Sequence, residues 1–90
     1  MAIYVDELFD YPNKGKWCHM ASDNPNPEEL HGFAQTIGLK HEWFQNHPLH
    51  PHYDLRPSKR KLAIQHGAIP VTRQQLVLKT SKFFNQPRKD

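Results

Sequence analysis

The sequence predicts a small α/β domain, with α+β as the alternative, in which a single-layer sheet of three to four short strands is packed by two to three helices. Short β-branched and aromatic segments alternate with helical patterns along the 90 residues, which is typical of such layering. Two predicted helices end in a glycine followed by an apolar residue, at Gly38 and at Gly67. A chain of this length buries only about 60% of its unfolded surface, so its ten aromatic residues are needed for the core. We expect one domain over residues 1–84 and a flexible basic tail over residues 85–90.

The first elements are two strands separated by a turn. Residues 3–5 are β-branched or aromatic and predict a short opening strand. Residues 10–15 combine proline, asparagine and glycine and therefore predict a turn. Residues 16–21 alternate polar and apolar side chains, which is typical of a second strand. The two strands either pair as a hairpin or flank a longer loop.

The clearest element is a helix that starts at Asn26 and Pro27. Asn26 is a favourable N-cap, Pro27 suits the first helical position, and Glu29 completes a pattern like a capping box. Apolar residues then recur at helical spacing, at Leu30, Phe33, Ala34 and Ile37. Gly38 can adopt the left-handed conformation that ends a helix, and Leu39 can pack against the last turn.

The middle of the chain is less regular. Residues 42–45 predict a third strand, whereas residues 47–52 hold too many prolines for a regular element. Residues 53–55 fit no single type of element. Pro57 and Ser58 then begin a second helix.

The last elements are an edge strand and a third helix. Residues 68–71 predict the strand, and Pro70 restricts it to an edge of the sheet because proline lacks the N–H that a central strand needs. Thr72 and Gln75 form a capping box. The third helix therefore starts there and extends as far as residues 83–84.

Charge is distributed unevenly. Residues 1–45 carry seven acidic and three basic side chains, a net charge of −4, whereas residues 46–90 carry two acidic and nine basic ones, a net charge of +7. The asymmetry is compatible with an anionic partner and also with attraction between the two halves of the fold. The single cysteine, Cys18, excludes an internal disulfide and a cysteine zinc site. No apolar run is long enough to span a bilayer and the first residues lack a signal-peptide pattern, so we expect a cytoplasmic protein with no membrane partner.

The chain contains several short motifs in the same order as a family of bacterial and phage proteins. The motifs are Tyr4-Val5-Asp6, Trp17 with His19, Leu30-His31-Gly32-Phe33-Ala34, Ile37-Gly38-Leu39, Trp43-Phe44-Gln45, Pro51-His52-Tyr53-Asp54-Leu55, and Ser58-Lys59-Arg60 ahead of Gly67-Ala68. Over residues 3–78 the chain resembles this family, which is called domain of unknown function 4031. The resemblance implies a small intracellular protein of bacteria or phages and implies no catalytic residues. The histidines of residues 47–50 are not part of the pattern.

The first candidate site is a phosphate cradle at the start of the second helix. A helix start carries unpaired backbone N–H groups and a partial positive charge, which attract anions. Four side chains add donors or positive charge there: Arg56, Ser58, Lys59 and Arg60. The run lacks the glycines of a Walker loop. The alternative is a capped helix whose basic face is solvated.

Three residues are candidates for chemistry beside this cradle. We expect His52 and His19 to contact the reacting group, with His52 as acid or base and Asp54 as the residue that orients it. Trp17 and Tyr53 are candidates for stacking on the ligand. For the tryptophan, core packing is the alternative.

A metal site is the second candidate, because seven histidines in 90 residues is a high number. One version uses the histidines of residues 47–52, since imidazole suits first-row metals. The members of a second version come from strand ends: Asp6, His19, Asp23, His52 and Asp54. The usual spacings of zinc motifs are absent, so the alternative is a polar loop with a hydrogen-bonded His19. The sequence assigns no cofactor beyond this optional divalent metal.

These candidates favour a protein that binds, with or without processing it, a phosphate-bearing small ligand of nucleotide-like chemistry. The first alternative is a metal-dependent phosphodiesterase or nuclease, and the second is a non-catalytic protein-interaction module. Basic residues interleaved with aromatic ones keep nucleic acid as a further partner. The small core keeps a homodimer as an alternative to a monomer. The sequence does not decide whether the protein is an enzyme.

Overall fold

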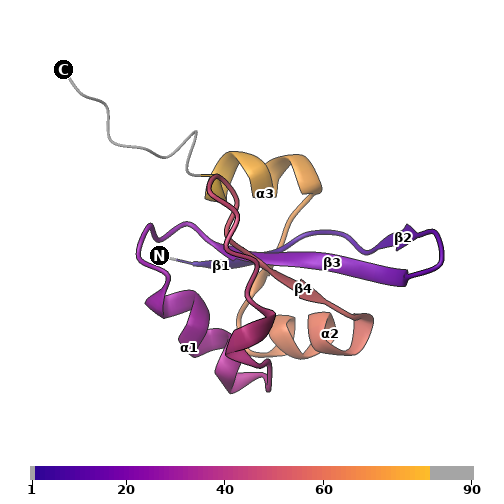
Figure 1. Cartoon of the computed structure of the whole chain (residues 1–90), viewed down its shortest axis with the longest axis horizontal. Helices are drawn as coiled ribbons and strands as arrows, with labels where there is room; N and C mark the ends of the chain where they lie inside the picture. The colour runs from indigo at the N-terminus through magenta and orange to yellow at the C-terminus, as the bar shows by residue number, and fades with distance from the viewer. Residues whose placement is uncertain (1, 82–90) are drawn as a thin grey trace.

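The computed structural model describes residues 2–81, and its main element is a mixed five-stranded sheet (Figure 1). The strands are β1 (Ile3–Val5), β2 (Phe9–Tyr11), β3 (Gly15–Ser22), β4 (Tyr53–Leu55) and β5 (Ile69–Pro70). The longest strand, β3, pairs antiparallel with β1, β2 and β4. At the edge of the sheet, β5 runs parallel to β1, as its proline predicts. The predicted fold class is confirmed, with five strands rather than three to four.

Three helices cover the two faces of the sheet. They are α1 (Glu28–Thr36), α2 (Pro57–Gln65) and α3 (Arg73–Thr80). Figure 1 shows α1 and α2 on one side of the sheet and α3 on the other. Within residues 2–81, no helix is long and apolar enough to cross a membrane.

Alternation along the strands gives the sheet one apolar and one polar face. Val5, Met20 and Leu55 are fully buried and form a hydrophobic core with residues of α1 and α2. Successive side chains of a strand point to opposite faces, so His19 and Asp54 lie on the face away from this core. The register of β3 and β4 places these two residues directly opposite each other. The alternation that builds the core therefore also pairs two polar residues from distant parts of the chain.

The predicted helix ends are largely confirmed. Gly38 and Gly67 have φ angles of +83° and +106° and follow α1 and α2. Thr72 and Gln75 form the predicted capping box, each side chain accepting the other residue's backbone N–H. The third helix ends at Thr80, before the predicted limit, and the predicted tail lies outside the described residues.

Two predictions for the middle of the chain are corrected. Residues 42–45 form no strand, because a short 3-10 helix, η1 (His41–Trp43), occupies the segment and only one isolated bridge, from Gln45 to His52, follows it. Residues 53–55, which fit no single type of element in the sequence, form β4. The turn predicted over residues 10–15 is shorter than expected, because Asp10 and Tyr11 belong to β2. Both of these strands pair with β3, which explains the larger sheet.

The start of α1 differs in detail from the predicted capping box. The side chain of Asn26 accepts the N–H of Glu28 at 3.0 Å, as a cap does. The carboxylate of Glu29 accepts the hydroxyl of Ser22 at 3.0 Å instead of turning back to the cap. Glu29 therefore ties α1 to the end of β3.

Candidate metal centre

A buried carboxylate, that of Asp6, lies where β1 ends beside the middle of β3. Asp6 is 1% exposed, and its N–H donates to the carbonyl of His19 at 3.1 Å. One carboxylate oxygen accepts the backbone N–H of His19 at 2.6 Å, and the other bonds Nδ1 of the His19 ring at 2.8 Å. Arg60 donates from Nε to the carbonyl of Asp6 at 2.8 Å. Asp6 therefore holds the imidazole of His19 in one orientation.

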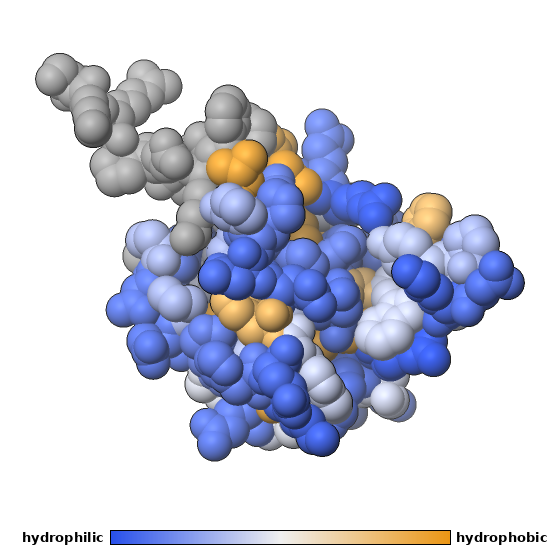
Figure 2. Space-filling view, viewed as in Figure 1, coloured by the Kyte–Doolittle hydropathy of each residue, from blue (hydrophilic) through white to orange (hydrophobic). Residues whose placement is uncertain are grey.

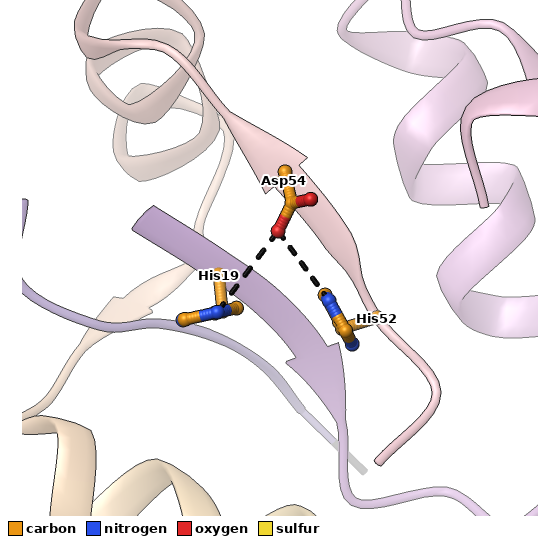
Figure 3. A group of neighbouring side chains, drawn as sticks. All are labelled: His19, His52 and Asp54. Carbon is orange, nitrogen blue, oxygen red and sulfur yellow. Dashed lines mark ion pairs between the residues drawn. The ribbon is translucent and has the colours of Figure 1, made fainter. Parts of the chain in front are cut away.

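The bond to Asp6 determines which ring nitrogen of His19 can bind a ligand. A carboxylate accepts a hydrogen bond, so Nδ1 carries the proton and Nε2 of the neutral ring carries the lone pair. Nε2 lies 4.0 Å from Oδ1 of Asp54, which comes from the neighbouring strand β4 (Figure 3). The lone pair of His19 therefore points to the polar face of the sheet.

A second imidazole is oriented in the same way just ahead of β4. Nδ1 of His52 donates to the carbonyl of His50 at 2.6 Å, which again leaves the lone pair on Nε2. Nε2 of His52 lies 3.4 Å from the same Oδ1 of Asp54 (Figure 3). The rings of His19 and His52 meet edge to face, with their centroids 5.1 Å apart. Both rings thus direct Nε2 toward one carboxylate oxygen.

Two of these groups have shifted pKa values. Burial lowers the pKa of His52, but the protonated ring can donate from Nε2 to Asp54 as well as from Nδ1 to the His50 carbonyl. These hydrogen bonds and the nearby carboxylates of Asp54 and Asp6 outweigh burial, so the pKa is raised. The hydrogen bond to His52 lowers the pKa of Asp54, against the effect of burial. The arrangement therefore combines an ionised carboxylate with an imidazole of increased basicity, which favours a bound proton or a bound metal.

We call His19, His52 and Asp54 the His/Asp cluster. One ligand atom of each of the three residues lies within 4.8 Å of those of the other two, and both Nε2 atoms lie within 4.0 Å of Oδ1 of Asp54. Imidazole and carboxylate are ligands of zinc and other first-row divalent metals, and three protein ligands leave a position open for water or substrate. A metal-bound histidine usually donates its other ring N–H to a carboxylate or carbonyl, as both histidines do here. The donor set and its surroundings fit a divalent metal.

The His/Asp cluster faces an open pocket of about 490 Å³. Three further residues line this pocket: Tyr11 at the end of β2, Lys14 in the following turn and Trp17 of β3. A smaller pocket of about 300 Å³ shares His19 and His52 with it and is lined by α3 and by residues 47–51. A ligand therefore has access to the cluster from solvent.

The four residues of the predicted phosphate cradle do not surround a single point. Arg56 donates to the carbonyl of Lys14 at 3.1 Å, Lys59 donates to the carbonyl of Ile37 at 2.7 Å, and Arg60 donates to Asp6. Arg56 also stacks on Trp17, with its guanidinium 4.6 Å from the ring centroid. Arg56, Ser58 and Lys59 line a common pocket that does not include Arg60.

Two other candidate residues, Asp23 and Tyr53, lie away from the His/Asp cluster, and a third, Asp6, is bonded to it. Asp23 accepts the N–H of Ala2 at 2.8 Å and the hydroxyl of Tyr4 at 3.4 Å. It lies just past the end of β3, four residues from His19, which is about 13 Å in an extended chain. Tyr53 is 1% exposed and lies on the core face, where its hydroxyl bonds Nδ1 of His31 at 2.8 Å. Asp6 belongs to the site as the partner of His19 rather than as a member of the His/Asp cluster.

The remaining histidines of the 47–52 stretch and the cysteine are also placed. The rings of His47 and His50 pair at 5.5 Å between centroids and line the smaller pocket. The His47 Nδ1 accepts the backbone N–H groups of Leu49 and His50 at 3.2 and 3.3 Å. Cys18 is buried, and burial raises the pKa of its thiol to about 12, so it is unreactive.

Two pocket residues were not singled out from the sequence, Tyr11 and Lys14. They reach the site because β2 and β3 form a hairpin in which Phe9 pairs with Trp17 and Tyr11 with Gly15. The available signal was the aromatic pair Phe9 and Tyr11, two residues apart as in a short strand, although Tyr11 falls within the turn predicted over residues 10–15.

Comparison with known proteins places the chain in a family. The chain matches, over residues 3–82, the family described as protein of unknown function (DUF4031), and all three residues of the His/Asp cluster fall within the match. No curated protein and no solved structure matches it. The family match confirms the resemblance that the sequence motifs indicate, and the chain belongs to the DUF4031 family.

Proposed function

We propose that this protein is a metal-dependent phosphoesterase that binds a first-row divalent metal through the His/Asp cluster. One observation carries the proposal: the Nε2 atoms of both rings lie 4.0 and 3.4 Å from the same oxygen of Asp54, while both Nδ1 atoms are already bound to acceptors. In the neutral rings, two lone pairs then face an anionic oxygen, and this arrangement is favourable only with a cation between them. A divalent metal supplies that cation for both rings at once, whereas protonation requires a separate proton on each ring.

The chemistry expected of such a centre is hydrolysis. A divalent metal with an open position lowers the pKa of a coordinated water and attracts a phosphate oxygen. The water oxygen forms a bond to phosphorus as the phosphorus–oxygen bond to the leaving group breaks, and the leaving oxygen ends with a proton. The pocket of about 490 Å³ in front of the His/Asp cluster gives the substrate access.

Charge supports a phosphate ester as the substrate. Lys14 lines the same pocket, and Arg56 is held beside it by the carbonyl of Lys14 and the ring of Trp17. Asp54 is the one carboxylate among the lining residues that the structure describes, and a metal would neutralise it. Lys14 and Arg56 would thus bind the phosphate, which the sequence predicts for Arg56 together with residues 58–60.

Two other functions use different features. Binding of a phosphate-bearing ligand without turnover needs the same pocket, so only an activity measurement separates it from hydrolysis. A protein-interaction module needs a docking surface, and the face in Figure 2 is mainly hydrophilic with small, separate hydrophobic patches. We propose hydrolysis because the His/Asp cluster offers a metal with an open position, and we place the protein in the cytoplasm, as the sequence suggests.

The proposal is tested by metal binding and by activity. We expect the chelator-treated protein to bind Zn²⁺ or Mn²⁺ in calorimetric titration, and the His52→Ala and Asp54→Asn variants to bind at least about a hundredfold more weakly, because each loses one of three ligands. The metal-loaded protein should hydrolyse p-nitrophenyl phosphate or its diester, and a chelator should abolish the activity.

A matched control is available at His47. His47 is exposed and lines the neighbouring pocket but is not in the His/Asp cluster, so His47→Ala should keep both metal affinity and activity. Equal metal affinity in the wild type and in both cluster variants would refute the metal centre. Tight metal binding without hydrolysis of either ester would refute the phosphoesterase.

A further inference from the structure

A third pocket, of about 510 Å³, lies beside the His/Asp cluster, where α2 starts and η1 packs. Two of its lining residues are tryptophans, Trp17 of β3 and Trp43 of η1, and we call it the tryptophan pocket. It shares Trp17 and Asp54 with the pocket in front of the His/Asp cluster. A ligand whose reacting group lies at the cluster can therefore extend past Trp17 into the tryptophan pocket. The volume is within the range of about 300–1,000 Å³ that small-molecule sites occupy.

The tryptophan pocket offers flat apolar surfaces. The indole of Trp17 is fixed, because its Nε1 donates to the carbonyl of Lys14 at 2.9 Å and the guanidinium of Arg56 stacks on it. Trp43 is 48% exposed, although a large aromatic side chain is usually buried. Leu39 adds an aliphatic surface. Rings of this kind bind planar heterocycles by stacking.

Exposed polar groups line the same pocket. The side chains of Glu42, Gln45 and Ser58 are exposed there and offer a carboxylate, an amide and a hydroxyl. These groups can donate to and accept from the edge of a heterocyclic base. Arg56 uses a single N–H on the carbonyl of Lys14, which leaves others for an anion, and Lys59 adds a second positive charge.

We propose that the tryptophan pocket binds the base of a nucleoside phosphate whose phosphate ester lies at the His/Asp cluster. The inference rests on the proposed phosphoesterase function and names its class of substrate. A nucleotide has a planar ring, a hydrogen-bonding edge and an anionic group. The lining residues offer aromatic rings for the first, polar side chains for the second and positive charge for the third. A sugar phosphate lacks the planar ring, so the two tryptophans favour the nucleotide over it.

Binding without metal tests this inference separately from catalysis. In the presence of a chelator, we expect adenosine 5′-monophosphate or uridine 5′-monophosphate to bind the full chain at least about fivefold more tightly than ribose 5-phosphate in calorimetric titration, because only the nucleotides stack. Trp43→Ala should remove this preference, and Trp43→Phe should keep most of it.

Controls separate the pocket from the fold and from the metal centre. Ile69 is 44% exposed on β5, away from the residues that line the pocket, so Ile69→Ala should keep the nucleotide preference. Equal affinity for ribose 5-phosphate and both nucleotides would overturn the inference, even where metal-dependent hydrolysis of p-nitrophenyl phosphate is observed. A nucleotide preference that Trp43→Ala removes would support it, even in a protein that hydrolyses no ester, and the phosphoesterase alone would then be wrong.

Discussion

The two faces of β4 carry histidine clusters of opposite character. On the polar face, Asp54 lies between His19 and His52, and nearby carboxylates raise the pKa of His52 against the effect of burial. On the core face, the hydroxyl of Tyr53 bonds Nδ1 of His31 at 2.8 Å. The same strand therefore holds a titratable cluster on one side and a packed imidazole on the other.

The surroundings of His31 explain why it is packed rather than reactive. Its ring lies 4.4 Å from that of His41 and 4.6 Å from that of Phe44, measured between centroids. Burial lowers the pKa of His31, as does His41, against a smaller opposing effect of Glu28. The two histidine clusters differ in their carboxylates rather than in their number of histidines, and we therefore propose a metal only on the polar face.

The largest expected effect concerns the core face. Tyr53 is 1% exposed, so Tyr53→Ala leaves a cavity between α1 and the sheet and should lower the free energy of unfolding by about 3–5 kcal/mol. His52→Ala changes the metal site instead and should cost the metal-free protein far less stability. Urea denaturation of both variants, with chelator present, measures the two effects. A similar loss of unfolding free energy in the two variants would contradict the view that the core face of β4 serves stability and its polar face serves function.

The next effect concerns the orientation of His19. In Asp6→Asn the amide can donate to the ring, which favours the tautomer with its proton on Nε2 and removes the lone pair that faces the His/Asp cluster. We expect Zn²⁺ affinity to fall by about 10–100-fold while the three ligand side chains remain. Asp23→Asn is the matched control, since Asp23 also accepts two hydrogen bonds but at the other end of the β1–β3 pair. An equal loss in both variants would indicate a general effect of removing a carboxylate.

Local patterns in the sequence predicted much of the fold. The opening strand, the long alternating strand and the glycines at 38 and 67 are confirmed because each depends on neighbouring residues alone. The short strand β4 could not be predicted, because three residues carry too weak a periodicity and its pairing with β3 bridges more than thirty residues of chain. The strand predicted over residues 42–45 does not form. Its place is taken by η1, and a single bridge from Gln45 to His52 follows.

The candidate site shows the same limit. His19, His52 and Asp54 were selected by residue type, but only the register that sets His19 against Asp54 brings them together. The side chain of Tyr53, one residue from Asp54, was expected at the ligand and lies in the core, since neighbouring strand residues face opposite ways. The sequence predicts one cradle from Arg56 to Arg60, whereas the start of α2 turns Arg60 toward Asp6 and leaves Arg56, the residue before the helix, beside Trp17.

The smallest effect separates the two histidine clusters by pH. In the metal-free protein, His52 should titrate above, and His31 below, the usual histidine pKa of about 6.5. The contribution of His52 to stability is then fully present below about pH 6.5 and is lost as the pH rises through its folded pKa. The contribution of His31 has the opposite sign: it is present above about pH 6.5 and is lost as the pH falls through its folded pKa.

Nuclear magnetic resonance titration of the ring protons measures both groups in one sample, and Zn²⁺ provides the internal control. Because a metal must displace the proton from Nε2 of His52, a saturating ion should abolish the titration of His52 and leave that of His31 unchanged. Metal affinity should accordingly weaken as the pH falls through the raised pKa of His52. If Zn²⁺ instead suppressed the titration of His31, the ion would have bound on the core side of β4, and the contrast between carboxylate-rich and carboxylate-poor histidines would be wrong.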